Sequence, residues 1–175
     1  ERTAIIFTSD NGYLLGQHRI ATKVLVYEES IRVPLMVRVP GLPGPASSSR
    51  LVLNNDLAPT IADLAGAVPG RAVDGRSLLG PVRDPAMPWR TRILVEHPAT
   101  GETYLAPPYL AVRETNASTG AVTVYAETLA TDGAQIKDVE LYTLRDDPYQ
   151  ERSKHNDPAY APALRRLHWF TRALA

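Results

Sequence analysis

The pattern of apolar and polar positions divides the chain into two parts. In the first part, a short continuous apolar run at residues 4–7 is typical of a strand covered on both faces in a parallel sheet. Residues 24–30 predict a short helix, and the apolar residues 35–39 predict a second strand. A longer helix is predicted over residues 55–66, where Asp56 is placed to cap its start. This part therefore reads as α/β.

The second part has a different pattern, in which short strand-like runs follow one another with turn residues between them. Consecutive strands without intervening helices indicate a small antiparallel four-stranded sheet. Val122, Val124 and Ala126 alternate with Thr123 and Tyr125, which predicts a sheet with one face in solvent. The four predicted strands are residues 92–96, 109–113, 121–127 and 140–144.

The longest helical pattern covers residues 158–174 at the end of the chain, and it is expected to pack on the sheet. His168 within it, like His97 and His155, reads as a packing residue rather than a ligand. The stretch before the sheet, residues 67–90, shows little periodicity and forms a natural boundary. We therefore expect two domains, an α/β part in residues 1–90 and an antiparallel subdomain in residues 91–175.

Composition narrows the classes of function. The 175 residues are 44% hydrophobic, enough to bury a core, and 19 basic residues balance 19 acidic ones. This balance gives no electrostatic footprint for a nucleic acid or an anionic membrane. There is no cysteine, no opening signal peptide, and no apolar run near the roughly 18 residues of a membrane helix. The compartment stays open.

Candidate chemistry gathers directly after the first predicted strand, where Asp10, Asn11 and Gly12 follow. Ligands bind beyond the carboxyl ends of strands in open α/β sheets, and carboxylate and amide oxygens suit Ca²⁺ or Mg²⁺. The alternative is that Asp-Asn-Gly forms an ordinary turn with glycine at positive φ. His18 and Lys23 follow closely, and beside a metal they would form a cradle for a tetrahedral oxyanion. Equally, they read as ordinary surface cations.

Four blocks in series carry a resemblance to type I sulfatases, members of the alkaline-phosphatase-like superfamily. The chain is similar to the C-terminal half of these enzymes, so the implied fold is the C-terminal part of the alkaline-phosphatase-like sulfatase fold. The blocks are residues 7–18 (FTSDNGYLLGQH) with Lys23, residues 27–34 (YEESIRVP) through 40–41, residues 56–66 (DLAPTIADLAG) with 74–78 (DGRSL), and residues 140–149 (ELYTLRDDPY).

The resemblance implies a role for each matching position. Asp10 and Asn11 match two protein ligands of a Ca²⁺ ion, sometimes Mg²⁺, and Lys23 matches the lysine that grips the sulfate group. His18 falls where some members have a substrate-side histidine. The family nucleophile is a formylglycine made in a Cys/Ser-X-Pro/Ala-X-Arg segment upstream. No such segment occurs in this sequence. Residues 47–50 (SSSR) have serine and arginine but lack the proline at the required spacing, and cysteine is absent.

The resemblance therefore predicts the C-terminal portion of a sulfatase that hydrolyses sulfate esters. Residues 16–17, 55–59 and 94–96 are similar to the branch with glucosamine-6-sulfatases, which favours a sulfated sugar. Two alternatives stay open. One is a phosphodiester or phosphonate monoester hydrolase of the same superfamily, and the other is a non-catalytic fragment that binds a sulfated glycan or a partner chain. We also expect self-association or a missing N-terminal half, because the first strand should be central in a larger sheet.

Overall fold

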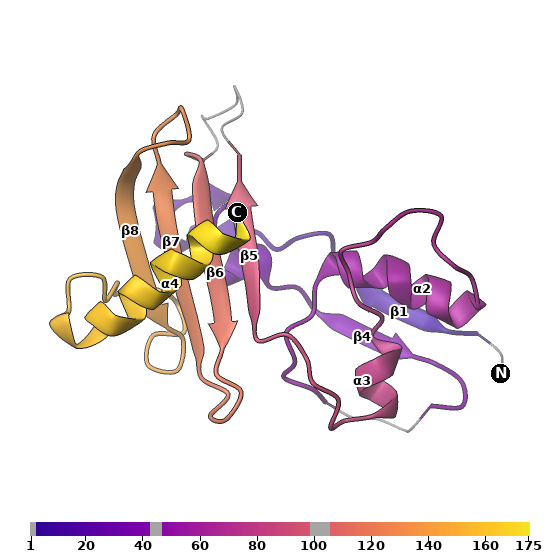
Figure 1. Ribbon diagram of the computed structural model, residues 1–175. Coiled ribbons are helices and arrows are strands. Elements are labelled where there is room, and N and C mark those ends of the chain that lie inside the picture. The colour runs from indigo at the N-terminus through magenta and orange to yellow at the C-terminus, as the bar shows by residue number, and fades with distance from the viewer. Residues whose placement is uncertain (1–2, 43–46, 99–105) are drawn as a thin grey trace. The chain divides into compact units, whose positions relative to one another are not determined.

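The computed structural model describes residues 3–42, 47–98 and 106–175 (Figure 1). Two compact units are described separately below. One contains the chain up to Asp10 together with Pro34–Arg90, and the other contains Asn11–Val33 together with Thr91–Ala175. Residues 11–33 thus group with the antiparallel part, while the division of the protein into domains at residues 90 and 91 stays a prediction.

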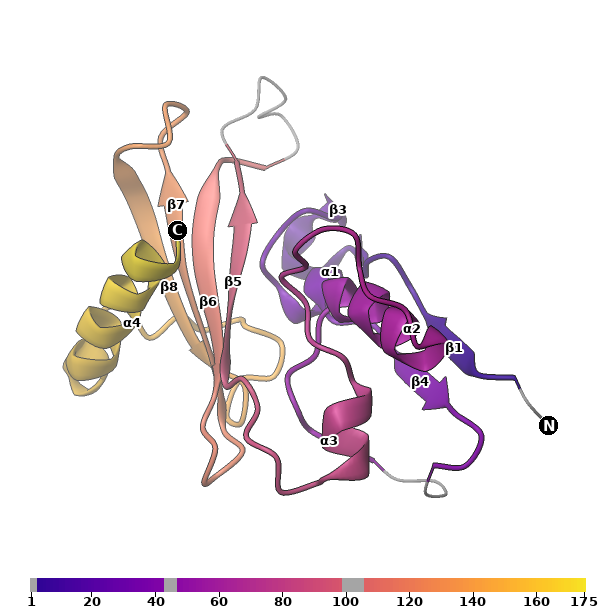
Figure 2. The same ribbon diagram turned by 45° about the vertical axis from the view of Figure 1, so that its right-hand side comes forward.

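The first unit is built on a two-stranded ribbon with a helix alongside it. Strand β1 (Ile5–Thr8) pairs antiparallel with β4 (Leu35–Arg38), so that Phe7 lies opposite Met36. Helix α2 (Leu57–Ala65) starts within two residues of its predicted position and lies beside this ribbon in both views (Figures 1 and 2). The remaining elements are the 3-10 turn η2 (Asn54–Asp56) and helix α3 (Leu79–Arg83).

The first strand lies where it was predicted, but the direction expected for its neighbour differs from the one found among the described residues. β1 was expected in a parallel sheet covered on both faces, but its partner among the described residues is the antiparallel strand β4. One face of the ribbon is exposed: Ile5 is 51%, Phe7 55% and Met36 60% accessible. A short apolar run indicates burial of a strand but not the direction of its neighbour, which explains the difference.

Asp56 connects the start of α2 with the end of the long connection that follows. Its buried carboxylate accepts a hydrogen bond of 2.7 Å from Arg90 Nη2 and one of 2.8 Å from the N–H of Arg76. Burial raises the pKa of Asp56, but the Arg90 guanidinium and the Arg76 N–H lower it more, so the net pKa lies below its ordinary value. Asp56 is therefore a structural anion inside this unit.

The second unit contains the predicted four-stranded antiparallel sheet, in the order β5-β6-β7-β8. This prediction is confirmed, although β8 starts four residues earlier than expected. The bounds are β5 (Arg92–His97), β6 (Tyr109–Thr115), β7 (Val122–Leu129) and β8 (Ile136–Thr143). After the turn η3 (Pro158–Tyr160), helix α4 (Ala161–Leu174) packs on the sheet as predicted.

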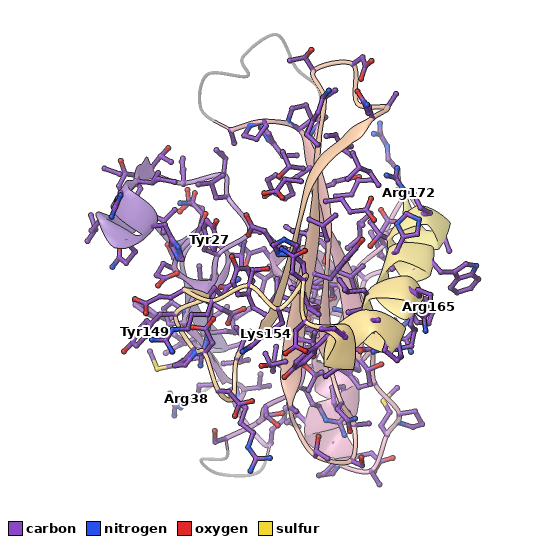
Figure 3. All side chains as sticks on the ribbon, turned by 90° about the vertical axis from the view of Figure 1, so that its left-hand side faces the viewer. Tyr27, Arg38, Tyr149, Lys154, Arg165 and Arg172 are labelled. Carbon is purple, nitrogen blue, oxygen red and sulfur yellow. The ribbon has the colours of Figure 1, made fainter. Side chains whose placement is uncertain are left out.

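Both faces of this sheet are covered at its centre, so the predicted solvent face is wrong. On one face, Val112, Tyr125 and Leu141 pack with Leu167 of α4. On the other face, Val26 packs in a second buried cluster with Tyr109, Ala111, Val124 and Ala126. Figure 3 shows Tyr27 and the α4 residues on opposite sides of the sheet. The alternation of residue types in β7 missed this because tyrosine and threonine suit a buried face as well as a wet one.

Residues 11–33 form a small hairpin and one turn of helix on the face opposite α4. The elements are β2 (Leu14–Leu15), the turn η1 (Gln17–Arg19), β3 (Ala21–Thr22) and helix α1 (Glu28–Ile31). The helix was predicted to begin at residue 24 but begins at Glu28. Val24 has a left-handed φ of 69°, and Val26 packs in the buried cluster on the sheet. Throughout the described residues, no helix has the length and apolar character needed to cross a membrane.

Gly12 is required by a close approach of the backbone, which gives a first prediction. A Cβ at this position would lie 2.0 Å from the carbonyl oxygen of Glu29, while the Gly12 N–H donates to Ser30 O at 2.8 Å. Gly12→Ala is therefore expected to lower the free energy of unfolding by roughly 1–3 kcal/mol, measured by chemical denaturation. Gly70→Ala is the matched control, because its Cβ would meet nothing within 4 Å. Equal stability of the two variants would contradict this packing.

Candidate metal and anion site

Asp10 lies just beyond β1 in the first unit, exposed at the end of the strand as predicted. Ser9 Oγ donates to Asp10 Oδ1 at 3.3 Å. The backbone here is held from η2, because Asn54 Nδ2 donates to the carbonyl oxygen of Asp10 at 2.7 Å. Asn54 was not identified from the sequence. Its only signal was an amide at a helix start, and the contact spans 44 residues.

Asn11 and Lys23 come together within the second unit. Lys23 Nζ donates to Asn11 Oδ1 at 3.2 Å, across 12 residues of sequence, and Asn11 Nδ2 donates to Gly12 O at 2.6 Å. The amide oxygen that the resemblance makes a metal ligand thus faces a cation here. The alternative of an ordinary turn with glycine at positive φ is wrong, because the backbone of Gly12 is not in the left-handed region. Glycine is required here because the carbonyl group of Glu29 lies where a Cβ would be.

His18 lies in η1 at the tip of the β2–β3 hairpin, in a strained backbone. Its φ is 54° and ψ 20°, the next residue Arg19 has φ 60°, and Gly16 before it has φ 113°. A positive φ is energetically unfavourable for residues other than glycine, and this conformation persists only where surrounding contacts hold it. The contact found here is a parallel stack of the His18 ring on Tyr27, with ring centroids 3.8 Å apart and an interplanar angle of 11°.

Tyr27 is in turn fixed by β8. Its hydroxyl donates to Glu140 Oε1 at 3.4 Å, and the hydroxyl of Tyr142 donates to Glu140 Oε2 at 3.1 Å. Burial, and then the negative charge of Glu140, raise the pKa of Tyr27 to about 12, so the phenol stays protonated and donates. Neither Tyr27 nor Glu140 was singled out from the sequence as part of a site, because they are 113 residues apart.

Glu28 attaches the same segment to the sheet a second time. Its buried carboxylate accepts hydrogen bonds from Arg113 Nε at 2.7 Å and from Arg113 Nη2 at 3.2 Å. Its backbone N–H donates to the side chain of Gln150 at 2.7 Å. The segment that carries Asn11, His18 and Lys23 is therefore fixed to the antiparallel sheet by charge, hydrogen bonds and apolar packing.

A divalent cation would find only a partial ligand set in the part of the chain that the structure describes. No group of three histidine, aspartate or glutamate side chains is arranged there to hold a metal ion. Ca²⁺ takes six to eight oxygen ligands, and Asp10 with Asn11 would supply two residues of such a shell. Carboxylate and amide oxygens are the hard donors that Ca²⁺ and Mg²⁺ prefer. In this structure Asn11 Oδ1 accepts a hydrogen bond from Lys23 Nζ.

Comparison with solved structures defines the class of fold. The chain superposes on BT4656, solved in complex with its substrate D-glucosamine-2-N,6-O-disulfate, with a TM-score of 0.81 and 24% identity over 97% of this chain and 33% of that one. It also superposes on the phosphonate monoester hydrolase of Agrobacterium radiobacter, with a TM-score of 0.69 and 24% identity over 98% of this chain and 34% of the other. The predicted C-terminal part of an alkaline-phosphatase-like sulfatase fold is thereby confirmed.

The family follows from the sequence. Residues 16–173 match the family described as N-sulphoglucosamine sulphohydrolase, C-terminal, so the chain belongs to that family. The human N-acetylglucosamine-6-sulfatase is 43% identical over 108 residues, which are 60% of this chain and 20% of the human protein. The N-acetylglucosamine-6-O-sulfatase of Bacteroides thetaiotaomicron is 39% identical over 79 residues, 45% of this chain and 14% of the relative. The chain therefore spans at most about a fifth of these relatives.

The contact between Asn54 and Asp10 gives a prediction. Asn54→Ala removes the donor to the Asp10 carbonyl and is expected to lower the free energy of unfolding by about 1 kcal/mol and to speed amide exchange near β1. Asn55→Ala is the control, because no hydrogen bond of that side chain is found among the described residues. Denaturation and hydrogen exchange measure both effects, and equal behaviour of the two variants would rule out this anchoring role.

Proposed function

We propose that this chain is the C-terminal portion of a sulfatase that hydrolyses sulfate esters, with a sulfated sugar as substrate. Family membership over residues 16–173 carries the proposal. The relatives support the reaction, because those that match include glucosamine-6-sulfatases from human and Bacteroides thetaiotaomicron and an arylsulfatase from Volvox carteri. The sugar is inferred from the names of the two glucosamine-6-sulfatases and from the substrate bound to BT4656.

In this proposal Lys23 binds a sulfate oxygen with its ammonium group. Lys23 is exposed in this chain, and a cation beside the transferring group stabilises negative charge that develops there, more strongly where water is excluded. The 3.2 Å contact of Lys23 Nζ with Asn11 Oδ1 supports this role, since it holds the ammonium next to a proposed metal ligand. Asp10 and Asn11, adjacent in the chain, would hold a Ca²⁺ or Mg²⁺ ion, which supplies further positive charge for a sulfate oxygen.

His18 is proposed to contact the substrate beside Lys23. Its ring face is occupied by Tyr27, and no hydrogen bond of either ring nitrogen is found within the described residues. An imidazole with free nitrogens offers a donor or an acceptor to a sulfate ester oxygen. The proposed division of roles is thus a fixed charge from Lys23 and a directional hydrogen bond from His18.

The nucleophile is proposed to come from outside this chain. The sequence contains no cysteine and no Cys/Ser-X-Pro/Ala-X-Arg segment, and relatives extend well beyond the matched region. The formylglycine that the resemblance implies would therefore belong to an N-terminal half. The exposed outer face of the β1–β4 ribbon, with Ile5, Phe7 and Met36, is the surface that we propose this half covers. Self-association through that face is the alternative.

Turnover by the full-length protein tests the proposed reaction. We expect hydrolysis of glucosamine 6-sulfate or an aryl sulfate, no turnover by the 175-residue chain alone, and a loss of roughly 100-fold or more in kcat for Lys23→Ala. Lys137→Ala is the matched control, an exposed lysine on β8 that bonds Gln135. The fold of the Agrobacterium radiobacter enzyme makes a phosphonate monoester the competing substrate. Faster turnover of that ester than of the sulfate esters would favour a phosphonate monoester hydrolase. Turnover by the isolated 175-residue chain would mean that this chain contains the nucleophile.

Metal removal tests the proposed ligands. Chelation of the full-length protein is expected to abolish turnover, and added Ca²⁺ or Mg²⁺ should restore it. Asp10→Ala should raise the metal concentration that is needed for half-maximal activity, because it removes one of the hard ligands. Asp138→Ala, an exposed aspartate on β8, serves as the control. Full activity after chelation, or equal metal dependence of the two variants, would contradict the assignment.

A further inference from the structure

We propose that Tyr27 is a positioning residue that holds the His18 imidazole with its nitrogen edge directed to the substrate. The inference rests on the proposed role of His18 and adds a residue to that site. Tyr27 does not itself contact the substrate in this proposal, because one face of its ring is covered by His18 and its hydroxyl is bonded to Glu140.

The backbone of His18 needs an external contact to hold it. Left-handed φ values at both His18 and Arg19 are unfavourable for residues with a Cβ, and Val24 on the far side of the hairpin, with φ 69°, is more unfavourable still because its side chain is β-branched. The hairpin itself is short, with two residues in each of β2 and β3. So few ladder hydrogen bonds would leave the tip free to relax unless a side chain held it.

The stack with Tyr27 supplies that contact in a specific orientation. A centroid separation of 3.8 Å with rings 11° from parallel fixes the plane of the imidazole and covers one of its faces. It leaves the nitrogen-bearing edge without a protein hydrogen bond in the described part of the chain. A side chain held by its face, with its polar edge open, is arranged to bind a ligand rather than to complete a network.

Tyr27 has rigid support of its own. Glu140 on β8 accepts from both Tyr27 and Tyr142, and the two tyrosine rings meet edge to face with centroids 6.4 Å apart. The preceding residue, Val26, is buried in the sheet cluster. Figure 3 shows Tyr27 beside the sheet on the face opposite α4. The position of His18 is thus set from the edge strand β8 through one aromatic ring.

The test begins with the solution geometry of the 175-residue chain. In proton NMR the His18 ring should show an upfield ring-current shift from Tyr27, retained in Tyr27→Phe and lost in Tyr27→Leu. Tyr160→Leu is the control, a partly buried tyrosine of the cluster on the α4 side. The same His18 shift in the wild type and in Tyr27→Leu would overturn the stack.

A double-mutant cycle in the full-length protein then tests positioning. His18→Ala and Tyr27→Leu are each expected to lower kcat/KM for a sulfate ester by about 10- to 100-fold, since small misplacements of a binding group cost that much. If Tyr27 acts through His18, the double variant loses no more than His18→Ala alone. Tyr27→Phe keeps the ring and should recover most of the activity, and Tyr160→Leu combined with His18→Ala should show independent effects.

The outcomes separate the inference from the proposed function. A wild-type protein without sulfate ester turnover overturns the proposed function before any variant is made. With wild-type turnover present, multiplied losses in the Tyr27→Leu, His18→Ala double variant overturn the positioning role. Unchanged kcat/KM in Tyr27→Leu, after loss of the ring-current shift, overturns it as well. Non-additive losses with recovery in Tyr27→Phe support it.

Discussion

The attachment of residues 11–33 to the antiparallel sheet is the constraint on which the rest of the second unit depends. Its strongest element is the ion pair between buried Glu28 and Arg113 of β6, with N–O distances of 2.7 and 3.2 Å. A buried carboxylate is tolerated only when it is paired, so loss of either partner costs about 3–5 kcal/mol. Val26 packs in the buried cluster on the sheet, and the hydroxyl of Tyr27 donates to Glu140 of β8. Together with Glu28, three successive residues therefore attach the segment to the sheet.

This attachment gives the C-terminal sheet a role beyond packing. Three of the proposed site residues, Asn11, His18 and Lys23, lie in the attached segment, whose hairpin has few hydrogen bonds and several strained residues. A binding group must be held to within a fraction of an ångström, and rigid elements achieve this better than loops. The sheet, covered on both faces and closed on one side by α4, is such an element.

Much of the fold was predictable from local pattern. The strands of the sheet, helix α2 and helix α4 follow from periodicity, and their positions are confirmed. The predicted cap is wrong, because the Asp56 carboxylate accepts from Arg76 and Arg90 and makes no capping hydrogen bond to α2. The antiparallel pairing of β1, the second covered face of β7 and the late start of α1 were not predictable. Each depends on residues distant in the sequence, such as Arg113, which lies 85 positions from Glu28. Likewise, sequence blocks pointed to Asp10, Asn11, His18 and Lys23, whereas supporting residues such as Asn54 and Tyr27 became apparent only from their contacts.

Hydrogen exchange in an Arg113→Met variant tests the central role of this attachment most directly. The amides of Gly12 and Ser30, which donate to Ser30 O and Tyr27 O, are expected to exchange faster in this variant, while the amides of α2 in the other unit keep their protection. Arg145→Met, an exposed arginine after β8, should leave both sets unchanged. Unaltered exchange at Gly12 and Ser30 in Arg113→Met, or an equal acceleration at every amide, would show that the Glu28–Arg113 pair does not hold this segment to the sheet.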